Sequence, residues 1–250
     1  MVFYFSGTGN SLQAARAVRA GEEALIDIAE CLREGRFRFA PGPEEAVGFV
    51  CPVYFGGLPS VVADFLKRFL LERPPRYCYA VLTCGSEPFG AAEMLSKALH
   101  ARGVRLHAAF RVIMPDNYVI MLRIPSEKEQ DRMLAAASEQ LEEIRAAVER
   151  REETGVHVSV RNRIATAGLY PSYLRGRKTA KFFADETCVG CGVCAKRCPV
   201  EAIKMVGGRP KWTADRCAHC MACLRCNAVQ YGKKTKKRKR YANPILKDCH

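Results

Sequence analysis

Short apolar runs and helical patterns alternate along the first half of the chain. Runs of strand type lie at residues 2–5, 24–28, 46–51, 77–84 and 104–114. Helical patterns without Gly or Pro lie at residues 12–18, 60–70 and 91–101. This alternation of strand and helix predicts an α/β fold with a parallel sheet. The stretch 33–45 contains Gly and Pro and is expected to be an excursion, disordered or without a role.

A long helix is predicted after Pro125. Ser126 and Glu129 have the spacing of a capping box. Apolar residues then recur at alternating three and four positions, namely at Leu134, Ala137, Leu141, Ile144 and Val148. This stripe predicts one helix that ends near Gly155 and packs on the sheet. A coiled-coil dimer contact is the alternative, although the stripe is short for one.

The segment 156–184 connects this half to a second, cysteine-rich half. It mixes cations with five large apolar residues, Leu169, Tyr170, Tyr173, Phe182 and Phe183. It is too apolar for a free tether. We therefore expect it to dock the second half onto the first, and a loosely packed helical linker is the alternative.

Three glycine-bearing loops follow predicted strands. The first, residues 6–11, reads Ser-Gly-Thr-Gly-Asn-Ser between a strand and a helix. Backbone N–H groups, hydroxyls and a helix N-terminus together suit a phosphate, whereas a plain turn with a Ser or Asn cap is the alternative. The loop has no lysine, so it is not the P-loop of a triphosphatase. Loops at 52–59 and 83–90 end at the same sheet edge, where ligands bind in such folds.

Composition suits a globular protein of two domains. The chain has 250 residues, 48% of them hydrophobic, and a formal charge of +14. An uncharged stretch around residues 46–62 is interrupted by Pro52 and Gly56, so it predicts a strand, a loop and a helix start instead of a membrane span. The N-terminus resembles no export signal, and we expect a cytoplasmic protein.

Two cysteine runs dominate the second half. The first is C-x2-C-x2-C-x3-C-P, the pattern in which three thiolates bind one four-iron cluster and the fourth binds a second cluster. The predicted ligands of cluster A are Cys188, Cys191, Cys194 and Cys226. The predicted ligands of cluster B are Cys217, Cys220, Cys223 and Cys198. Zinc sites would leave ligands over, and a disulfide framework does not suit a cytosolic protein.

The second run departs from the expected pattern at its last cysteine. Its final spacer is one residue short and no proline follows Cys226. Either Cys226 still reaches cluster A through an altered loop, or cluster A is labile, three-iron or otherwise ligated. His219, between two predicted ligands, is expected to hydrogen-bond a cluster sulfur or to face water. Cys31, Cys51, Cys78 and Cys249 are predicted to be free thiols.

A basic run follows the cysteines. Residues 233–240 contain seven cations in eight positions, which predicts a solvated, mobile tail. Nucleic-acid binding is disfavoured because no aromatic interleaving or base-reading motif accompanies the run. An acidic redox partner, steered by charge, is the simpler expectation.

Several motifs together carry a family resemblance. They are Phe-Ser-Gly-Thr-Gly-Asn-Ser at 5–11, Pro-Val-Tyr-Phe-Gly-Gly-Leu-Pro at 52–59, Met-Pro-Asp-Asn-Tyr at 114–118, Tyr-Gly-Lys-Lys-Thr at 231–235, and the cysteine runs. With these motifs the chain resembles the fused flavodoxin–ferredoxin proteins of anaerobic bacteria and archaea, the EFR-family ferredoxins. The resemblance implies a flavodoxin-like domain with FMN and sheet order 2-1-3-4-5, and a small α+β ferredoxin domain with two [4Fe-4S] clusters.

The resemblance also implies roles for residues and segments. Five residues would form the phosphate loop, namely Ser6, Thr8, Gly9, Asn10 and Ser11. Eight more would surround the flavin ring, namely Pro52, Tyr54, Phe55, Gly56, Gly57, Cys84, Gly85 and Phe89. Of these, Tyr54 or Phe55 would stack on the ring unless both are core residues, and the Gly56–Gly57 peptide would lie near flavin N5. The expected parts are 1–155 (flavodoxin-like), 156–184 (linker), 185–232 (ferredoxin-like) and 233–250 (basic tail).

The expected function is electron transfer among FMN, the two clusters and a redox partner protein. No acid–base or nucleophile constellation for substrate turnover is evident. An FMN-dependent reductase supplied by the clusters is the enzyme alternative, and a cavity beside Tyr118 would favour it. A third hypothesis makes the clusters structural and the basic tail a nucleic-acid anchor. The oligomeric state stays open.

Overall fold

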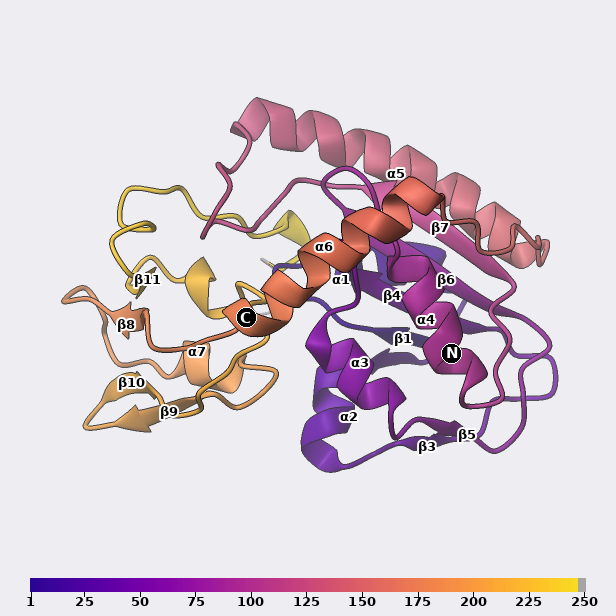
Figure 1. The fold of residues 1–250 in the computed structure, drawn as a ribbon, viewed down its shortest axis with the longest axis horizontal. Helices are drawn as coiled ribbons and strands as arrows, with labels where there is room; N and C mark the ends of the chain where they lie inside the picture. The colour runs from indigo at the N-terminus through magenta and orange to yellow at the C-terminus, as the bar shows by residue number, and fades with distance from the viewer. Residues whose placement is uncertain (247–250) are drawn as a thin grey trace.

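The computed structural model describes residues 1–246. Their helices and strands fall into a large N-terminal α/β module and a smaller C-terminal module (Figure 1). The N-terminal elements are β1 (Val2–Tyr4), α1 (Asn10–Val18), β2 (Leu25–Asp27), α2 (Ile28–Glu34), β3 (Arg38–Phe39), β4 (Val47–Pro52), α3 (Ser60–Leu66), β5 (Leu70–Leu71), β6 (Cys78–Cys84), α4 (Ala91–His100), β7 (Ala108–Ile113) and α5 (Glu127–Glu149). The later elements are α6 (Val160–Gly176), β8 (Phe182–Ala184), α7 (Val193–Lys196), β9 (Ile203–Val206), β10 (Arg209–Trp212), the 3₁₀ turn Cys223–Arg225, β11 (Val229–Tyr231) and the 3₁₀ turn Pro244–Leu246.

A five-stranded parallel sheet forms the centre of the N-terminal module. Its strand order is β2-β1-β4-β6-β7. Counted without the short parallel pair β3 and β5, this is the order 2-1-3-4-5 of flavodoxin-like folds. The predicted fold class and strand order are therefore confirmed. Loops that follow β1, β4 and β6 meet at one edge of the sheet.

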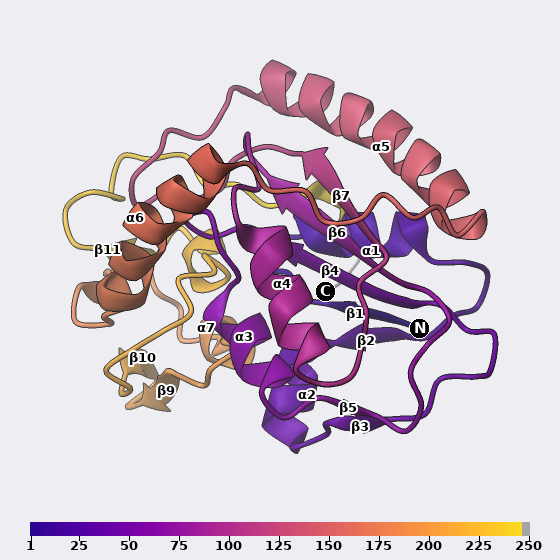
Figure 2. The same cartoon turned by 45° about the vertical axis from the view of Figure 1, so that its right-hand side comes forward.

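Helices cover both faces of this sheet (Figure 2). One core joins the sheet to α2, α3 and α4, and a second core joins it to α1 and α5. Ser126 caps α5 as predicted, because its side chain accepts a hydrogen bond from the N–H of Glu129 (3.3 Å). All five residues of the predicted stripe pack in the second core. The stripe is thus covered by the sheet, and the coiled-coil alternative has no surface left to use.

The excursion at residues 33–45 is ordered, unlike one of our expectations. Its strand β3 pairs with β5, and Phe37 and Phe39 are buried in the first core. Phe39 packs edge-on against Phe3, with 4.7 Å between ring centroids. The sequence pattern hid this strand because only two residues pair, too few to show an alternation.

Helix α6 connects the modules and docks on the sheet-edge loops. Tyr173 is buried, and its hydroxyl accepts a hydrogen bond from the N–H of Ser60 (3.1 Å) and donates one to the carbonyl of Ala218 (3.0 Å). The hydroxyl of Tyr170 donates to the carbonyl of Leu58 (2.8 Å). The predicted docking through aromatic residues is confirmed for these two tyrosines. Leu169 and Phe183 stay largely exposed.

The C-terminal module is built on two short antiparallel pairs, β9 with β10 and β8 with β11. Phe182, Ile203 and Leu224 belong to its own small core, while Ala218 and Cys220 pack into the first core of the N-terminal module. The two modules therefore share a continuous apolar interior. No helix among residues 1–246 has the length and apolarity to cross a membrane.

The basic run at residues 233–240 is packed, which corrects the expectation of a mobile tail. Thr235 is fully buried, and Arg238 donates to the carbonyl of Val119 (2.7 Å). Arg240 donates to the carbonyl of Val229 (2.9 Å). The lysines of the run stay exposed, so its charge faces solvent while its arginines and Thr235 hold it in place.

Candidate functional site

The loop between β1 and α1, residues 5–9 (loop 1), leaves a helix N-terminus open. Gly9 precedes α1 with φ of +102°, a conformation that favours glycine. No side chain caps the first N–H groups of α1, and the hydroxyl of Ser6 accepts from the N–H of Gly9 (3.1 Å). Free N–H groups at the positive end of a helix attract an anion.

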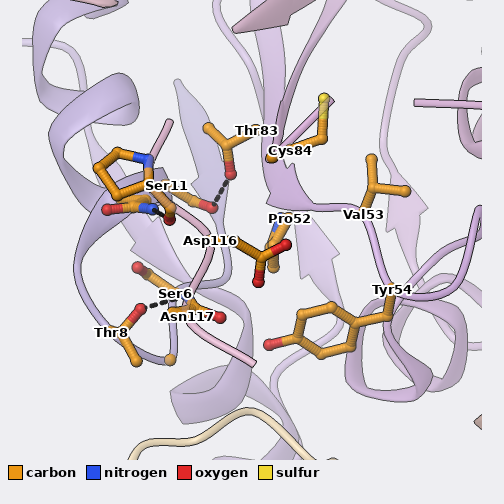
Figure 3. Close-up of a pocket in the computed structure, with 14 residues that line it drawn as sticks. Ser6, Thr8, Ser11, Pro52, Val53, Tyr54, Thr83, Cys84, Asp116 and Asn117 are labelled. Carbon is orange, nitrogen blue, oxygen red and sulfur yellow. Dashed lines mark hydrogen bonds between the residues drawn. The ribbon is translucent and has the colours of Figure 1, made fainter. Parts of the chain in front are cut away.

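A polar cavity of about 60 Å³ lies beside loop 1. Figure 3 shows Thr8 and Asn117 joined by a hydrogen bond on one side and the ring of Tyr54 across from them. The cavity is lined by Ser6, Gly7, Thr8, Asn10, Ser11, Pro52, Val53, Tyr54, Thr83, Cys84, Gly85, Pro115, Asp116 and Asn117. Four of the five predicted phosphate-loop residues line it, and the fifth, Gly9, serves as the turn before α1.

Side chains that line this cavity are held in place by hydrogen bonds within the protein. The hydroxyls of Ser11 and Thr83 lie 2.8 Å apart, and both residues are buried. The amide of Asn10 donates to the carbonyl of Pro115 (3.0 Å). These contacts use the hydroxyl of Ser11 and the amide of Asn10 within the protein, so the N–H groups of the first turn of α1 are left for an anion.

An apolar cavity of about 350 Å³ continues from the polar one, because Val53 and Tyr54 line both. Its lining comes from both modules and consists of Val53, Tyr54, Phe55, Tyr118, Met121, Leu122, Leu169, Tyr173 and His219. Phe55 stacks on Tyr173 (5.9 Å between centroids, 23° between planes). A polar end and a flat apolar end together suit a ligand with an anionic tail and an aromatic ring.

The remaining predicted ring residues lie apart from these cavities. A hairpin turn joins Tyr54 to Gly57 through two backbone hydrogen bonds, and its tip residues Phe55 and Gly56 both have positive φ. The turn faces α6, since a Cβ on Gly57 would come within 2.4 Å of the Tyr170 ring. Gly56, Gly57 and Phe89 therefore line neither cavity.

Cysteines of the C-terminal module surround two further cavities. One, of about 370 Å³, is lined by Cys188, Cys191, Cys194, Cys223 and Cys226. The other encloses a smaller space of about 20 Å³ and is lined by Cys198, Cys217, Cys220 and Cys223. These groups contain the two predicted ligand sets, and the shortened spacer does not remove Cys226 from the first. Within residues 1–246, no group of three or more His, Cys, Asp or Glu side chains is arranged to hold a single metal ion. The thiols line the two cavities instead.

The buried thiols suit a metal cluster chemically. Burial raises the pKa of Cys217 and of Cys220 to about 12. Thiols of such pKa ionise at neutral pH only when a cation compensates the charge, as a metal ion does. Cys31, Cys51 and Cys78 are free thiols, as predicted, whereas Cys249 lies outside the described residues.

The two cysteine loops share a backbone geometry but differ in residue type. Gly190 and Gly192 of the first loop have positive φ, and the corresponding positions of the second loop are His219 (φ 52°) and Met221 (φ 64°). A left-handed conformation costs such residues about 1–2 kcal/mol. Strain of this kind clusters at functional positions, so the side chains at 219 and 221 are candidates for a role.

His219 joins the apolar cavity to the second cysteine cavity, since it lines both. Its Nδ1 lies 3.0 Å from the hydroxyl of Tyr118, and the ring is 6% exposed. Burial lowers its pKa. Its backbone N–H donates to Cys217 Sγ (3.3 Å), so the predicted contact with a ligand sulfur comes from the main chain and the side chain turns to Tyr118.

Some site residues received no role from the sequence. Asp116 and Asn117 follow β7 after Met114 and Pro115 and belong to the 114–118 motif, and polar residues just beyond a strand end were a usable signal. Thr83, at the end of β6, offered the same signal. The C-terminal residues Tyr241 and Asn243, which contact loop 1 and α1, gave no local signal.

Comparisons with known proteins give one family match. Residues 180–226 match the family model described as a 4Fe-4S dicluster domain. No curated protein matches the chain. The C-terminal module is therefore similar to a 4Fe-4S dicluster domain, and the chain joins this module to one with a flavodoxin-like fold.

Solved structures resemble the N-terminal module at low identity. The flavodoxin of Streptococcus pneumonia TIGR4 is 15% identical, with 58% of this chain and 96% of that chain covered and a TM-score of 0.35. The NAD(P)H:quinone oxidoreductase of Methanothermobacter marburgensis is 14% identical, with 62% of this chain and 97% of that chain covered and a TM-score of 0.39. An FMN-dependent NADH-azoreductase of Bacillus anthracis in complex with FMN is 9% identical, with 59% of this chain and 98% of that chain covered and a TM-score of 0.35.

Proposed function

We propose that the protein transfers electrons between FMN, two [4Fe-4S] clusters and a redox partner protein. The observation that carries the proposal is the position of His219, which lines both the apolar cavity and the second cysteine cavity. FMN can exchange one or two electrons at a time, whereas each cluster exchanges one. Adjacent sites would therefore let the protein connect a two-electron donor or acceptor with one-electron carriers.

Residues of the N-terminal module would bind FMN. The open N–H groups of α1 would hold its phosphate, with Thr8 and Asn117 beside them. Tyr54 and Phe55 would contact the ring system in the apolar cavity, and α6 would exclude water through Tyr173. These roles agree with the shape and polarity of the two joined cavities.

Cysteines of the C-terminal module would hold the clusters in the sets predicted from the spacing. Cys188, Cys191, Cys194 and Cys226 would hold cluster A. Cys198, Cys217, Cys220 and Cys223 would hold cluster B. Cluster B would adjoin the flavin through His219, whereas cluster A would lie toward the surface, where Cys191 and Cys226 are exposed.

The partner would meet the surface around cluster A and would be acidic. Val189, inside the first cysteine loop, is 87% exposed. Lys204 and Lys211 stand directly opposite each other on β9 and β10, and both are exposed. Like charges in this position destabilise a hairpin, and an acidic partner would compensate them.

Cofactor quantitation after anaerobic purification tests the proposal. We expect about eight iron, eight sulfide and one FMN per chain. About four iron would mean that one cysteine set holds no cluster. Full iron without FMN would overturn the flavin part and leave a ferredoxin on a flavodoxin-like scaffold.

A reductase is the second candidate function, favoured by the cavity beside Tyr118. Its mouth carries the exposed apolar side chains of Met121, Leu122 and Leu169, which could admit a small apolar molecule. Reduction of a soluble quinone by the chemically reduced protein distinguishes the candidates. Saturation with quinone concentration would favour the reductase, and a linear dependence would favour the carrier.

A further inference from the structure

The segment of residues 241–246 (the C-terminal segment) packs on loop 1 and the start of α1. The N–H of Asn243 donates to the carbonyl of Thr8 (2.8 Å). A Cβ on Gly9 would come within 2.6 Å of Asn243 Cβ and 2.9 Å of Leu246. Tyr241 and Asn243 are 4% and 2% exposed. The contact is therefore a closely packed interface around the turn that opens the helix N-terminus.

The side chains of this segment fix Asn10, the first residue of α1. The hydroxyl of Tyr241 donates to Asn10 Oδ1 (2.6 Å), and the amide of Asn243 donates to the same oxygen (3.2 Å). Asn243 Nδ2 also donates to Gln13 Oε1, one turn along α1 (2.6 Å). With its oxygen engaged twice, Asn10 must direct its amide to Pro115, as observed. The first turn of α1 is thus held from outside its own module.

The other end of the segment is tied to the iron–sulfur module. Arg240, which precedes it, donates through Nη2 to the carbonyl of Val229 and to Gln230 Oε1 (both 2.9 Å). Gln230 is buried and in turn donates to Asp185 (2.9 Å). The backbone from Arg240 to Asn243 is therefore hydrogen-bonded to β11 at one end and to loop 1 and α1 at the other.

We propose that the C-terminal segment completes the phosphate site, with Tyr241 and Asn243 as positioning residues that hold Thr8 and Asn10 in the conformation that binds the phosphate of FMN. This inference rests on the proposed binding of FMN. It makes the iron–sulfur module a structural part of the flavin site. Neither Tyr241 nor Asn243 lines the polar cavity, so both would act through Asn10 and its neighbours.

Flavin titrations of the cluster-loaded, full-length protein test the inference. FMN and riboflavin differ in the phosphate, so a defect in the phosphate site lowers the affinity for FMN alone. For Asn243→Ala we expect an FMN affinity about tenfold lower, which corresponds to about 1.4 kcal/mol, and an unchanged riboflavin affinity. Tyr241→Phe removes a single hydrogen bond and should lower FMN affinity less. Asn227→Ala, an exposed position of the same module, is the matched control and should match the wild type.

Two results would overturn the inference. One is an unchanged FMN affinity in both variants, and the other is an equal loss of FMN and riboflavin affinity, which would indicate a general structural defect. Amide hydrogen exchange at residues 8–12 should be faster in Asn243→Ala than in the wild type, whether or not flavin is present. If the wild-type protein bound neither FMN nor riboflavin, the proposed function would be refuted, and with it FMN as the ligand of this site. Amide hydrogen exchange at residues 8–12 would still show separately whether the C-terminal segment holds loop 1.

Discussion

Replacing Gly7 by alanine probes the contact between loop 1 and the iron–sulfur module. A Cβ at Gly7 would lie 2.0 Å from the carbonyl oxygen of Cys220, and ordinary contact begins near 3.4 Å, so the two backbones must separate by 1.4 Å (3.4 minus 2.0). Overpacking costs about 1–3 kcal/mol in protein cores. Because both groups belong to the main chain and neither can rotate away, we expect about 3 kcal/mol, the upper end of that range.

Urea unfolding of the anaerobic, cluster-loaded protein, followed by circular dichroism, measures this loss. Gly168→Ala in α6 is the matched control, since a Cβ there meets nothing within 4 Å. In a helix interior that change should stabilise the protein by about 1 kcal/mol. The two variants are therefore expected to change the free energy of unfolding in opposite directions. If Gly7→Ala stayed within about 0.5 kcal/mol of the wild type, the range for ordinary surface changes, the modules would not be in tight contact and our reasoning would be refuted.

Three further predictions concern single side chains. Tyr118→Phe removes the hydrogen-bond partner of buried His219 and should lower the free energy of unfolding by about 1–3 kcal/mol; an unchanged urea midpoint would mean that the bond contributes nothing. Arg197 lines the cavity proposed for cluster A, so Arg197→Gln should lower the potential of that cluster by about 40 mV, the one-electron equivalent of ~1 kcal/mol, in an anaerobic redox titration; an unchanged potential would contradict this expectation. Burial raises the pKa of the Asp27 carboxyl in the folded protein, so the ionised carboxylate destabilises the fold at pH values above 3.8, the ordinary pKa of an aspartate. Asp27→Asn removes this charge and should therefore raise the melting temperature at pH 7. The gain should vanish as the pH falls below 3.8, where the wild-type carboxyl is also neutral. A gain independent of pH would contradict the last of these.

Patterns that span a few residues were enough to predict the sheet and to group the cysteines that line the two cavities. The apolar runs that became β1, β4 and β6 stand next to the loops that carry the polar cavity, and strand order followed from the family resemblance. The spacing of the run at Cys188 groups its first three thiols, and Cys188, Cys191 and Cys194 line one cavity together. Cys226 was doubtful on spacing alone, and it lines the expected cavity.

Contacts between distant segments could not be predicted in this way. The sequence did not reveal that the Gly56–Gly57 turn packs under α6, where Thr166 and Tyr170 contact it. The place of this peptide near flavin N5 stays a prediction. Helix α6 has Pro171 in its interior and no clear apolar face, so its sequence does not reveal which surface it covers. The basic run was interpreted from its charge, which says nothing about which guanidinium reaches a buried carbonyl.

The pairing of Asn10 with Tyr241 and Asn243 affects when the protein can mature during its synthesis. These hydrogen bonds join residues 231 and 233 positions apart. At about 5–20 residues per second, roughly 10–50 s separate the emergence of loop 1 from that of its contacts. During this interval the N-terminal module can form its sheet, whereas the first turn of α1 lacks the bonds that fix Asn10. Newly made chains should therefore fix the conformation of Asn10 only once residues 241–243 have emerged, and an N-terminal fragment that lacks these residues should form its sheet without that conformation.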